Sequence, residues 1–222
     1  AWHSYLASTE RIVGRMLDRN GDARFLDLSG GRGVFEQPEV AAAADESYGI
    51  VWAARVSGHW RVNARRHDAG NLSPTVELSP AGLDALHPVV TKLPTGGYAV
   101  AWVQQRAGRF EIAWTRYETD LPPAAAVISS PAEDSFRPVL LTTRAGEVWA
   151  FWDAYRDRRN RVLARRLLPT GGNIEEVSDM PDRCFRATAA EAPDGTLHAG
   201  WVRATDVMSV DGAIDQLHTL HV

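Results

Sequence analysis

The sequence has a single cysteine, Cys184, so no disulfide can form within the chain. No apolar run approaches the roughly 20 residues of a membrane-spanning helix, so we expect a soluble chain without a transmembrane segment. Its opening residues, AWHSYLASTE, lack the charged and apolar regions of an export signal. Against 28 acidic residues, the 24 basic residues leave a net charge of −4 and form no Lys/Arg-rich run. Nucleic acid is therefore not an expected partner.

Several motifs of enzymes and metal proteins are also absent. The stretch SGGRG lacks the lysine and the following helix of a phosphate-binding loop, and no G-x-S-x-G sequence occurs. His218 and His221 form H-x-x-H, but side chains three apart on a strand point to opposite faces and do not share a metal. Lone cysteines are more often inert than catalytic, and we interpret Cys184 in that way. We expect neither a cofactor nor a metal.

What the sequence does have is a repeat. Five tryptophans, separated by 50, 50, 50 and 49 residues, are Trp2, Trp52, Trp102, Trp152 and Trp201. Proline precedes three of the later tryptophans at a constant offset (Pro38, Pro88 and Pro138), and Ala187 replaces it in the last copy. Arginine and serine positions also recur in phase, at Arg15, Arg65 and Arg165 and at Ser29, Ser79 and Ser129. One structural unit is therefore repeated along the chain.

Each repeat predicts four antiparallel strands. Tyr98, Val100 and Trp102 alternate with small residues, which is the period of two that indicates a strand, and Gly-containing turns separate the runs. Four-stranded units of 40 to 50 residues are typical of β-propeller blades. We predict an all-β fold, a single β-propeller domain over residues 1–222, with tryptophans buried between blades. The approximate repeats are 1–30 (partial), 36–79, 86–129, 136–178 and 185–222 (partial).

The two ends leave alternatives open. Both are cut inside a blade, so the five repeats predict either a five-bladed ring or a fragment of a larger propeller that a second chain or domain completes. Residues 8–19 also fit a helix, although their in-phase Ile12 and Arg15 favour a strand. The last repeat carries an insertion, TDVMSVDGAID, before its third strand.

The segments GYAVAW with EIAWTRY, and FRPVLLTTRAGEVWAFWDAYRDRRNRVLARRL, resemble bacterial extracytoplasmic β-propeller repeats. The shared pattern is P-x-V, a Gly-containing turn, v-v-a-W, a short loop and I-x-x-R, and it covers nearly the whole chain. This resemblance implies the fold and an extracytoplasmic, periplasmic or secreted, location. It implies no single activity, because such repeats occur in adhesins, gating domains and sugar-binding modules. The last repeat departs from the pattern at Ala187 and in its insertion.

The candidate site consists of equivalent repeat positions at which the side chain differs from one repeat to the next. Gln37, His87, Arg137 and Arg186 occupy the position just before the recurring proline, and Phe136 and Phe185 precede the two arginines. We expect these six side chains to converge at the channel mouth. Guanidinium groups match carboxylates and phosphates, so a glycan or a small anionic ligand is a suitable guest, with a protein partner as another. The structural alternative is that these polar groups cap strand ends. Trp60 and Phe110 near the hairpin turns either stack on a sugar ring or, as we favour, cover the core.

The leading hypothesis is a non-enzymatic propeller that binds a ligand, glycan or protein through its loop face. One alternative is a carbohydrate-active enzyme that uses two carboxylates of the channel; another is a substrate-gating domain of a larger enzyme. The acids that could serve the enzyme are Glu36, Glu39, Asp84, Asp134, Asp182 and Glu191. Asp153 follows its tryptophan where the other repeats have no acid, an outlier that a surface salt bridge would equally explain.

Overall fold

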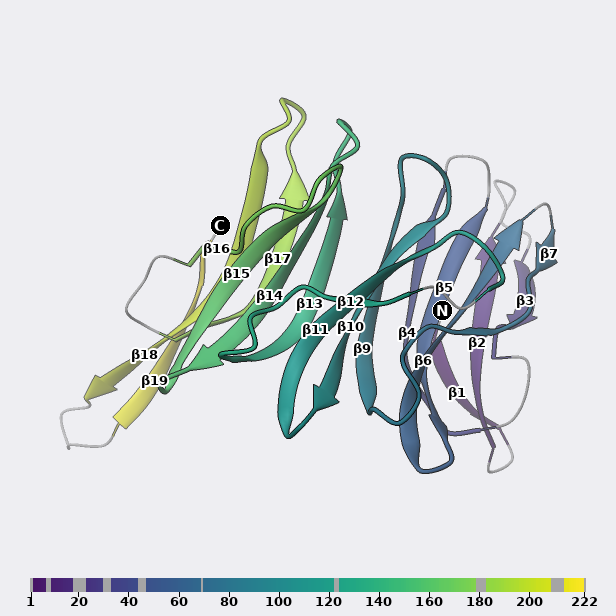
Figure 1. Cartoon of the computed structure of the whole chain (residues 1–222), viewed down its shortest axis with the longest axis horizontal. Coiled ribbons are helices and arrows are strands. Elements are labelled where there is room, and N and C mark those ends of the chain that lie inside the picture. The colour runs from purple at the N-terminus through teal and green to yellow at the C-terminus, as the bar shows by residue number, and fades with distance from the viewer. Residues whose placement is uncertain are drawn as a thin grey trace.

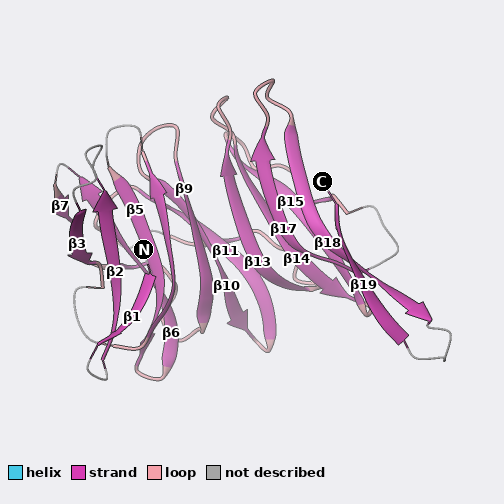
Figure 2. Ribbon diagram, turned by 180° about the vertical axis from the view of Figure 1, so that it is seen from behind, coloured by secondary structure: helices cyan, strands magenta, loops and turns pink. Residues whose placement is uncertain are grey.

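Every element described in the computed structural model of this chain is a β-strand, and the strands form five separate antiparallel sheets (Figures 1 and 2). The structure describes residues 2–6, 9–17, 23–29, 33–43, 47–68, 70–121, 124–178, 183–208 and 214–221, and side chains within 10–15, 25–29 and from 33 to 204 of these ranges. Within them there is no helix long and apolar enough to cross a membrane.

The sheets follow the repeats in chain order. The first contains β1 (Trp2–Leu6), β2 (Thr9–Leu17) and β3 (Ala23–Asp27). The second contains β4 (Phe35–Ala42), β5 (Tyr48–Val56), β6 (His59–Asp68), β7 (Asn71–Leu72) and β8 (Val76–Glu77). The third contains β9 (Ala85–Lys92), β10 (Tyr98–Arg106), β11 (Arg109–Tyr117) and β12 (Ala126–Val127). The fourth contains β13 (Asp134–Thr142), β14 (Val148–Arg156), β15 (Arg159–Leu168) and β16 (Glu175–Glu176). The fifth contains β17 (Arg183–Glu191), β18 (Leu197–Met208) and β19 (Ile214–His221).

We call these sheets the first to fifth blades. The opening strand of each later blade packs against the opening strand of the next, so β4, β9, β13 and β17 form the inner row. The first and fifth blades stand at opposite ends of the row, where the N and C labels also lie (Figure 1). None of the described strands β1–β3 pairs with β17–β19, so the two ends do not share one sheet.

The structure shows strands in two segments for which the sequence left the secondary structure open. The segment with alternative helical spacing is the strand β2, paired on both sides with β1 and β3. The insertion of the last repeat lengthens the β18–β19 hairpin, whose register runs from Trp201 opposite His221 to Met208 opposite Ile214. The backbone of His218 and His221 lies on β19, and their side chains fall outside the described residues.

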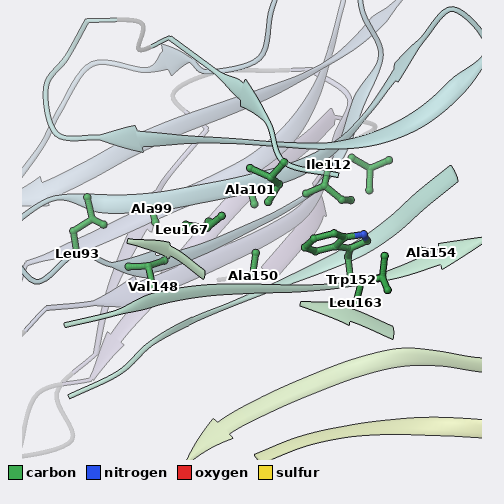
Figure 3. Close-up of a cluster of buried hydrophobic side chains, with 12 residues drawn as sticks. Leu93, Ala99, Ala101, Ile112, Val148, Ala150, Trp152, Ala154, Leu163 and Leu167 are labelled. Atoms are coloured by element: carbon green, nitrogen blue, oxygen red, sulfur yellow. The ribbon is translucent and has the colours of Figure 1, made fainter. Parts of the chain in front are cut away.

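The tryptophans of the middle repeats form the core between blades. Trp52, Trp102 and Trp152 are at most 1% exposed, and each lies in a separate apolar cluster with residues of the preceding blade. Figure 3 shows Trp152 packed with Ala101 and Ile112 of the third blade. Burying one indole contributes about 4 to 6 kcal/mol before entropy is deducted. The predicted structural role of these tryptophans is confirmed.

The recurring serine and arginine positions are also explained by backbone contacts. Oγ of Ser79, Ser129 and Ser178 accepts the N–H of the third strand of its own blade, at 2.9 to 3.0 Å. The arginines reach the blade before them: Arg65 Nη1 lies 3.4 Å from the carbonyl of Leu28, and Arg165 Nη1 lies 3.1 Å from that of Ile128. The repeat pattern therefore records contacts that hold blades and their neighbours together.

Candidate functional site

Four of the predicted site residues share an unusual backbone conformation. Gln37, His87, Arg137 and Arg186 have φ angles of 55°, 53°, 49° and 58°, in the left-handed region. Each lies where the register of an inner strand shifts against its neighbour, so each occupies a β-bulge. For a side chain other than glycine, this conformation costs about 1 to 2 kcal/mol. Four inner strands therefore each hold a variable side chain at the same strained position.

Gln37 joins the second blade to the third. Its Oε1 accepts the backbone N–H of His87 at 2.7 Å, and its Nε2 lies 2.8 Å from His87 Nδ1. Because a backbone N–H only donates, Oε1 must face it, and Nε2 then donates to Nδ1. The imidazole is therefore held as the neutral tautomer with its proton on Nε2. Partial burial, and then the charge of Arg137, lower the pKa of His87.

A hollow of about 370 Å³ opens beside His87. Three half-buried aromatic side chains from successive blades line it: Trp60, Phe110 and Phe136. Phe110 and Phe136 pack with their ring centroids 5.0 Å apart. The polar side chains of the lining are His87, Asp84 and Gln105, and the remaining apolar ones are Leu86 and Val103.

Two predicted catalytic acids hold these aromatic residues in position. Asp84 Oδ1 accepts the backbone N–H of Trp60 at 2.8 Å, and Asp134 Oδ1 accepts that of Phe110 at 2.9 Å. Each carboxylate belongs to the entry of one blade and fixes the hairpin of the blade before it. The sequence analysis treated these acids and these aromatic residues as separate candidates, whereas the structure connects them by hydrogen bonds.

The arginine end of the row is organised by Asp153, on β14. Its side chain is 2% exposed, and Arg137 Nη1 lies 3.5 Å from its Oδ2. The same oxygen accepts the backbone N–H of Arg186 at 2.9 Å, and Oδ1 accepts that of Ala187 at 3.3 Å. Burial raises the pKa of Asp153, while these donors and Arg137 act in the opposite direction.

The remaining predicted acids are distributed over other roles. Glu191 accepts the backbone N–H of Arg144 at 2.8 Å. Partial burial raises the pKa of Glu39, which lies on the inner strand β4. Glu36 acts electrostatically on His87, and Asp182 lies outside the described residues.

The structure therefore gathers most, but not all, of the predicted site. Gln37 contacts His87, His87 and Phe136 line one hollow, and Arg137 meets Arg186 through Asp153. Phe185 precedes Arg186 on β17 and does not line the hollow. Cys184 is buried, and the described residues include no group of three or more potential metal ligands.

Sequence reasoning gave Asp153 too little weight. Asp153 does pair with an arginine, Arg137, but its carboxyl group is buried and also accepts two backbone N–H groups of the next blade. The signal was present in two places, because Asp153 is an acid after a repeated tryptophan and Ala187 replaces the repeated proline. That these two exceptions touch each other is visible in the tertiary structure alone.

Solved structures with this fold include several propeller enzymes. An endo-arabinase from Bacteroides thetaiotaomicron matches 95% of this chain over 92% of its own, at 13% identity and a TM-score of 0.52. A protein of unknown function from Dyadobacter fermentans matches 94% of this chain over 71% of its own, at 10% identity and a TM-score of 0.60. An α-L-arabinofuranosidase of family GH93 from Fusarium graminearum matches 84% of this chain over 62% of its own, at 12% identity and a TM-score of 0.53.

These likenesses confirm the predicted all-β propeller fold, and the number of blades in the ring stays a prediction. No profile of a known protein family matches the sequence, so the resemblance to extracytoplasmic repeats extends to the propeller architecture alone. No curated protein matches it either.

Proposed function

We propose that this chain is a carbohydrate-active β-propeller that binds a glycan in the aromatic hollow between its middle blades. The observation that carries this proposal is the convergence of Trp60, Phe110 and Phe136 around one opening with His87. The C–H face of a sugar ring is apolar and packs on an aromatic ring, while its hydroxyl groups require polar partners. A volume of about 370 Å³ lies in the range of small-molecule sites, which combine apolar walls with a few polar groups.

Two features support a glycan over other guests. The solved structures of this fold include an endo-arabinase and an arabinofuranosidase, which favours the carbohydrate-active alternative over a non-enzymatic binding module. The backbone N–H groups of Trp60 and Phe110 also donate hydrogen bonds to Asp84 and Asp134, so the hollow exists before a ligand arrives. Preorganisation of this kind reduces the entropy lost on binding. We further propose a single propeller domain over residues 1–222 and an extracytoplasmic location.

The likeness to an endo-arabinase and an arabinofuranosidase favours glycoside hydrolysis as a second candidate function, and the raised pKa of Glu39 on the inner strand β4 supports it. A glycosidase uses one carboxyl group as proton donor and a second as base or nucleophile, and the donor needs a pKa above the ordinary range. Glu39, on the inner strand β4, would donate the proton. Hydrolysis would then decrease as the pH rises through the pKa of Glu39.

The test is binding and hydrolysis of arabinan by the whole chain. We expect the wild-type protein to be retarded in a gel containing arabinan, and Phe110→Ala to lose at least tenfold in affinity. Phe25→Ala is the matched control, since Phe25 is 65% exposed on the outer strand β3 of the first blade. Unchanged retardation of the Phe110→Ala variant would show that the hollow is not the glycan site.

Reducing-end release from arabinan tests the second candidate separately. We expect Glu39→Gln to abolish release while arabinan retardation persists. A wild-type chain that binds arabinan without releasing reducing ends would remove hydrolysis of this polymer and leave the binding proposal intact.

A further inference from the structure

The row of bulge residues changes in charge from one end to the other. Gln37 is uncharged, and His87 is kept neutral by its lowered pKa and its bond to Gln37. Arg137 and Arg186 are cations, because an arginine side chain does not lose its proton in a protein. The neutral end adjoins the aromatic hollow, and the cationic end continues from it through Phe136 and Arg137, which are neighbours in the chain.

The two arginines differ in how far their charge is already balanced. Arg137 Nη1 lies 3.5 Å from the buried carboxylate of Asp153. The Arg186 side chain is exposed, and among the described residues no carboxylate forms an ion pair with it. Its backbone is nevertheless fixed, because Asp153 accepts its N–H at 2.9 Å. Arg186 therefore combines an anchored main chain with an unbalanced guanidinium group.

Three arginines of the preceding, fourth blade provide a contrast. At the β14–β15 hairpin, Arg156 lies 3.2 Å from Asp157, and Arg159 and Arg161 each lie 3.2 Å from Glu176. These guanidinium groups already have carboxylate partners within the chain. Arg186 lies on the inner strand β17 with φ at 58°, and no carboxylate of the described residues forms an ion pair with its guanidinium group.

Resting on the proposed function, we infer that the natural ligand is an acidic glycan, and that Arg186 binds the carboxylate of a uronic acid residue next to the sugar held in the hollow. A guanidinium fork matches a carboxylate with two parallel hydrogen bonds. Asp153 would act as a positioning residue, since it holds Arg186 through the main chain and restrains Arg137. The aromatic hollow would bind the sugar ring, and Arg186 would bind the negative charge of the neighbouring uronic acid.

The overall charge restricts the kind of anion. The net charge of −4 gives the chain no overall attraction for an anion, so attraction must be local. One unbalanced guanidinium fits one carboxylate better than a continuous track of phosphates. An oligosaccharide whose acid groups are spaced by sugar rings meets both conditions.

The experiment compares polygalacturonate with its fully methyl-esterified form, because esterification removes the charge and keeps the backbone. We expect the wild-type protein to bind the acid form at least tenfold more tightly at low salt, and 0.5 M NaCl to reduce that difference. Arg186→Ala should bind both forms equally, and Arg186→Lys should recover part of the preference. Arg116→Ala, which removes an exposed arginine of β11, the third strand of the third blade, is the control of equal charge.

The outcomes separate the two proposals. Equal wild-type binding of the two forms, or an unchanged preference in Arg186→Ala, would overturn the acidic-glycan inference. If Phe110→Ala still weakened binding of the esterified form in that case, the proposed glycan site would stand. Absence of binding to both pectin forms and to arabinan would overturn the proposed function together with the inference.

Discussion

Asp153 and Ala187, two residues that break the repeat, are bonded to each other: the backbone N–H of Ala187 donates to Asp153 Oδ1 at 3.3 Å. In the three preceding repeats a proline occupies the position of Ala187 and has no N–H to donate. The residue after the tryptophan in the second and third blades is correspondingly Ala53 or Val103. A donor and an acceptor have therefore been introduced together at the junction of the fourth and fifth blades.

This relationship predicts energetic coupling. Asp153→Val alone leaves the N–H groups of Arg186 and Ala187 without an acceptor, which we expect to cost about 2 to 5 kcal/mol of unfolding free energy. Ala187→Pro in the same chain removes one of those donors, and the φ of 58° at Arg186 matches the residues before proline in the other blades. The double variant should therefore lose about 1 kcal/mol less than the sum of the single variants. Denaturant unfolding of all four proteins measures the coupling, and strict additivity would contradict it.

The titration of Asp153 should depend on Arg137. Burial is the largest influence on its raised pKa, and Arg137 opposes it, so Arg137→Ala should raise the pKa further. A carboxyl group with a raised folded pKa contributes most stability below its unfolded pKa of about 3.9, and this contribution decreases as the pH rises through the folded value. The stability of wild type relative to Asp153→Asn should follow that course. Carbon NMR of the carboxyl group gives the pKa directly, and a lower value in Arg137→Ala would refute the assignment.

The bond between Gln37 and His87 sets the protonation of the imidazole. Gln37→Glu replaces the amide N–H with a carboxylate oxygen near Nδ1, which favours a proton there and should raise the pKa of His87. In the wild type the lowered pKa makes the folded state lose stability as the pH falls below about 6.5, because the unfolded chain binds the proton more readily. Gln37→Glu should reduce that loss. Proton NMR of the imidazole follows both variants, with Gln37→Met as the uncharged control.

Gln104 satisfies a buried indole N–H that other blades leave without a partner. Trp102 Nε1 donates to Gln104 Oε1 at 3.0 Å, whereas Trp52 and Trp152 Nε1 are buried without a hydrogen-bond partner among the described residues. Residue 54 and residue 154, which match Gln104 in the repeat, are alanines. We expect Gln104→Ala to cost about 1 to 3 kcal/mol, and the exposed neighbour variant Gln105→Ala to change stability by less than about 0.5 kcal/mol. Similar midpoints of thermal unfolding for the two variants would be inconsistent with this role.

Two substitutions of Arg186 should have the same effect on ligand preference and different effects on the free energy of unfolding, because Arg186 lies in a left-handed bulge. Glycine adopts a positive φ without strain, so Arg186→Gly should be about 1 kcal/mol more stable than Arg186→Ala. Both variants lack the guanidinium and should show the same loss of preference for the acid form of polygalacturonate. Equal stabilities, measured by denaturant unfolding, would mean that the backbone relaxes when the side chain is removed.

The repeated unit, its strands and the side chains that hold them together could all be predicted from the amino-acid sequence. Period-two alternation and buried tryptophans depend on local geometry and on contacts between adjacent repeats, both of which recur every 50 residues and are visible as a period. The same period selected Gln37, His87, Arg137 and Arg186, because residues at one repeat position share one place in every blade.

Only the tertiary structure shows which of these side chains contact one another. In it Gln37 contacts His87, an aromatic hollow opens beside His87, and Asp84 and Asp134 accept the backbone N–H groups of Trp60 and Phe110. It also buried Asp153 and paired it with Ala187. These contacts depend on side-chain direction and on the packing of one blade against the next, and a one-dimensional period does not encode either.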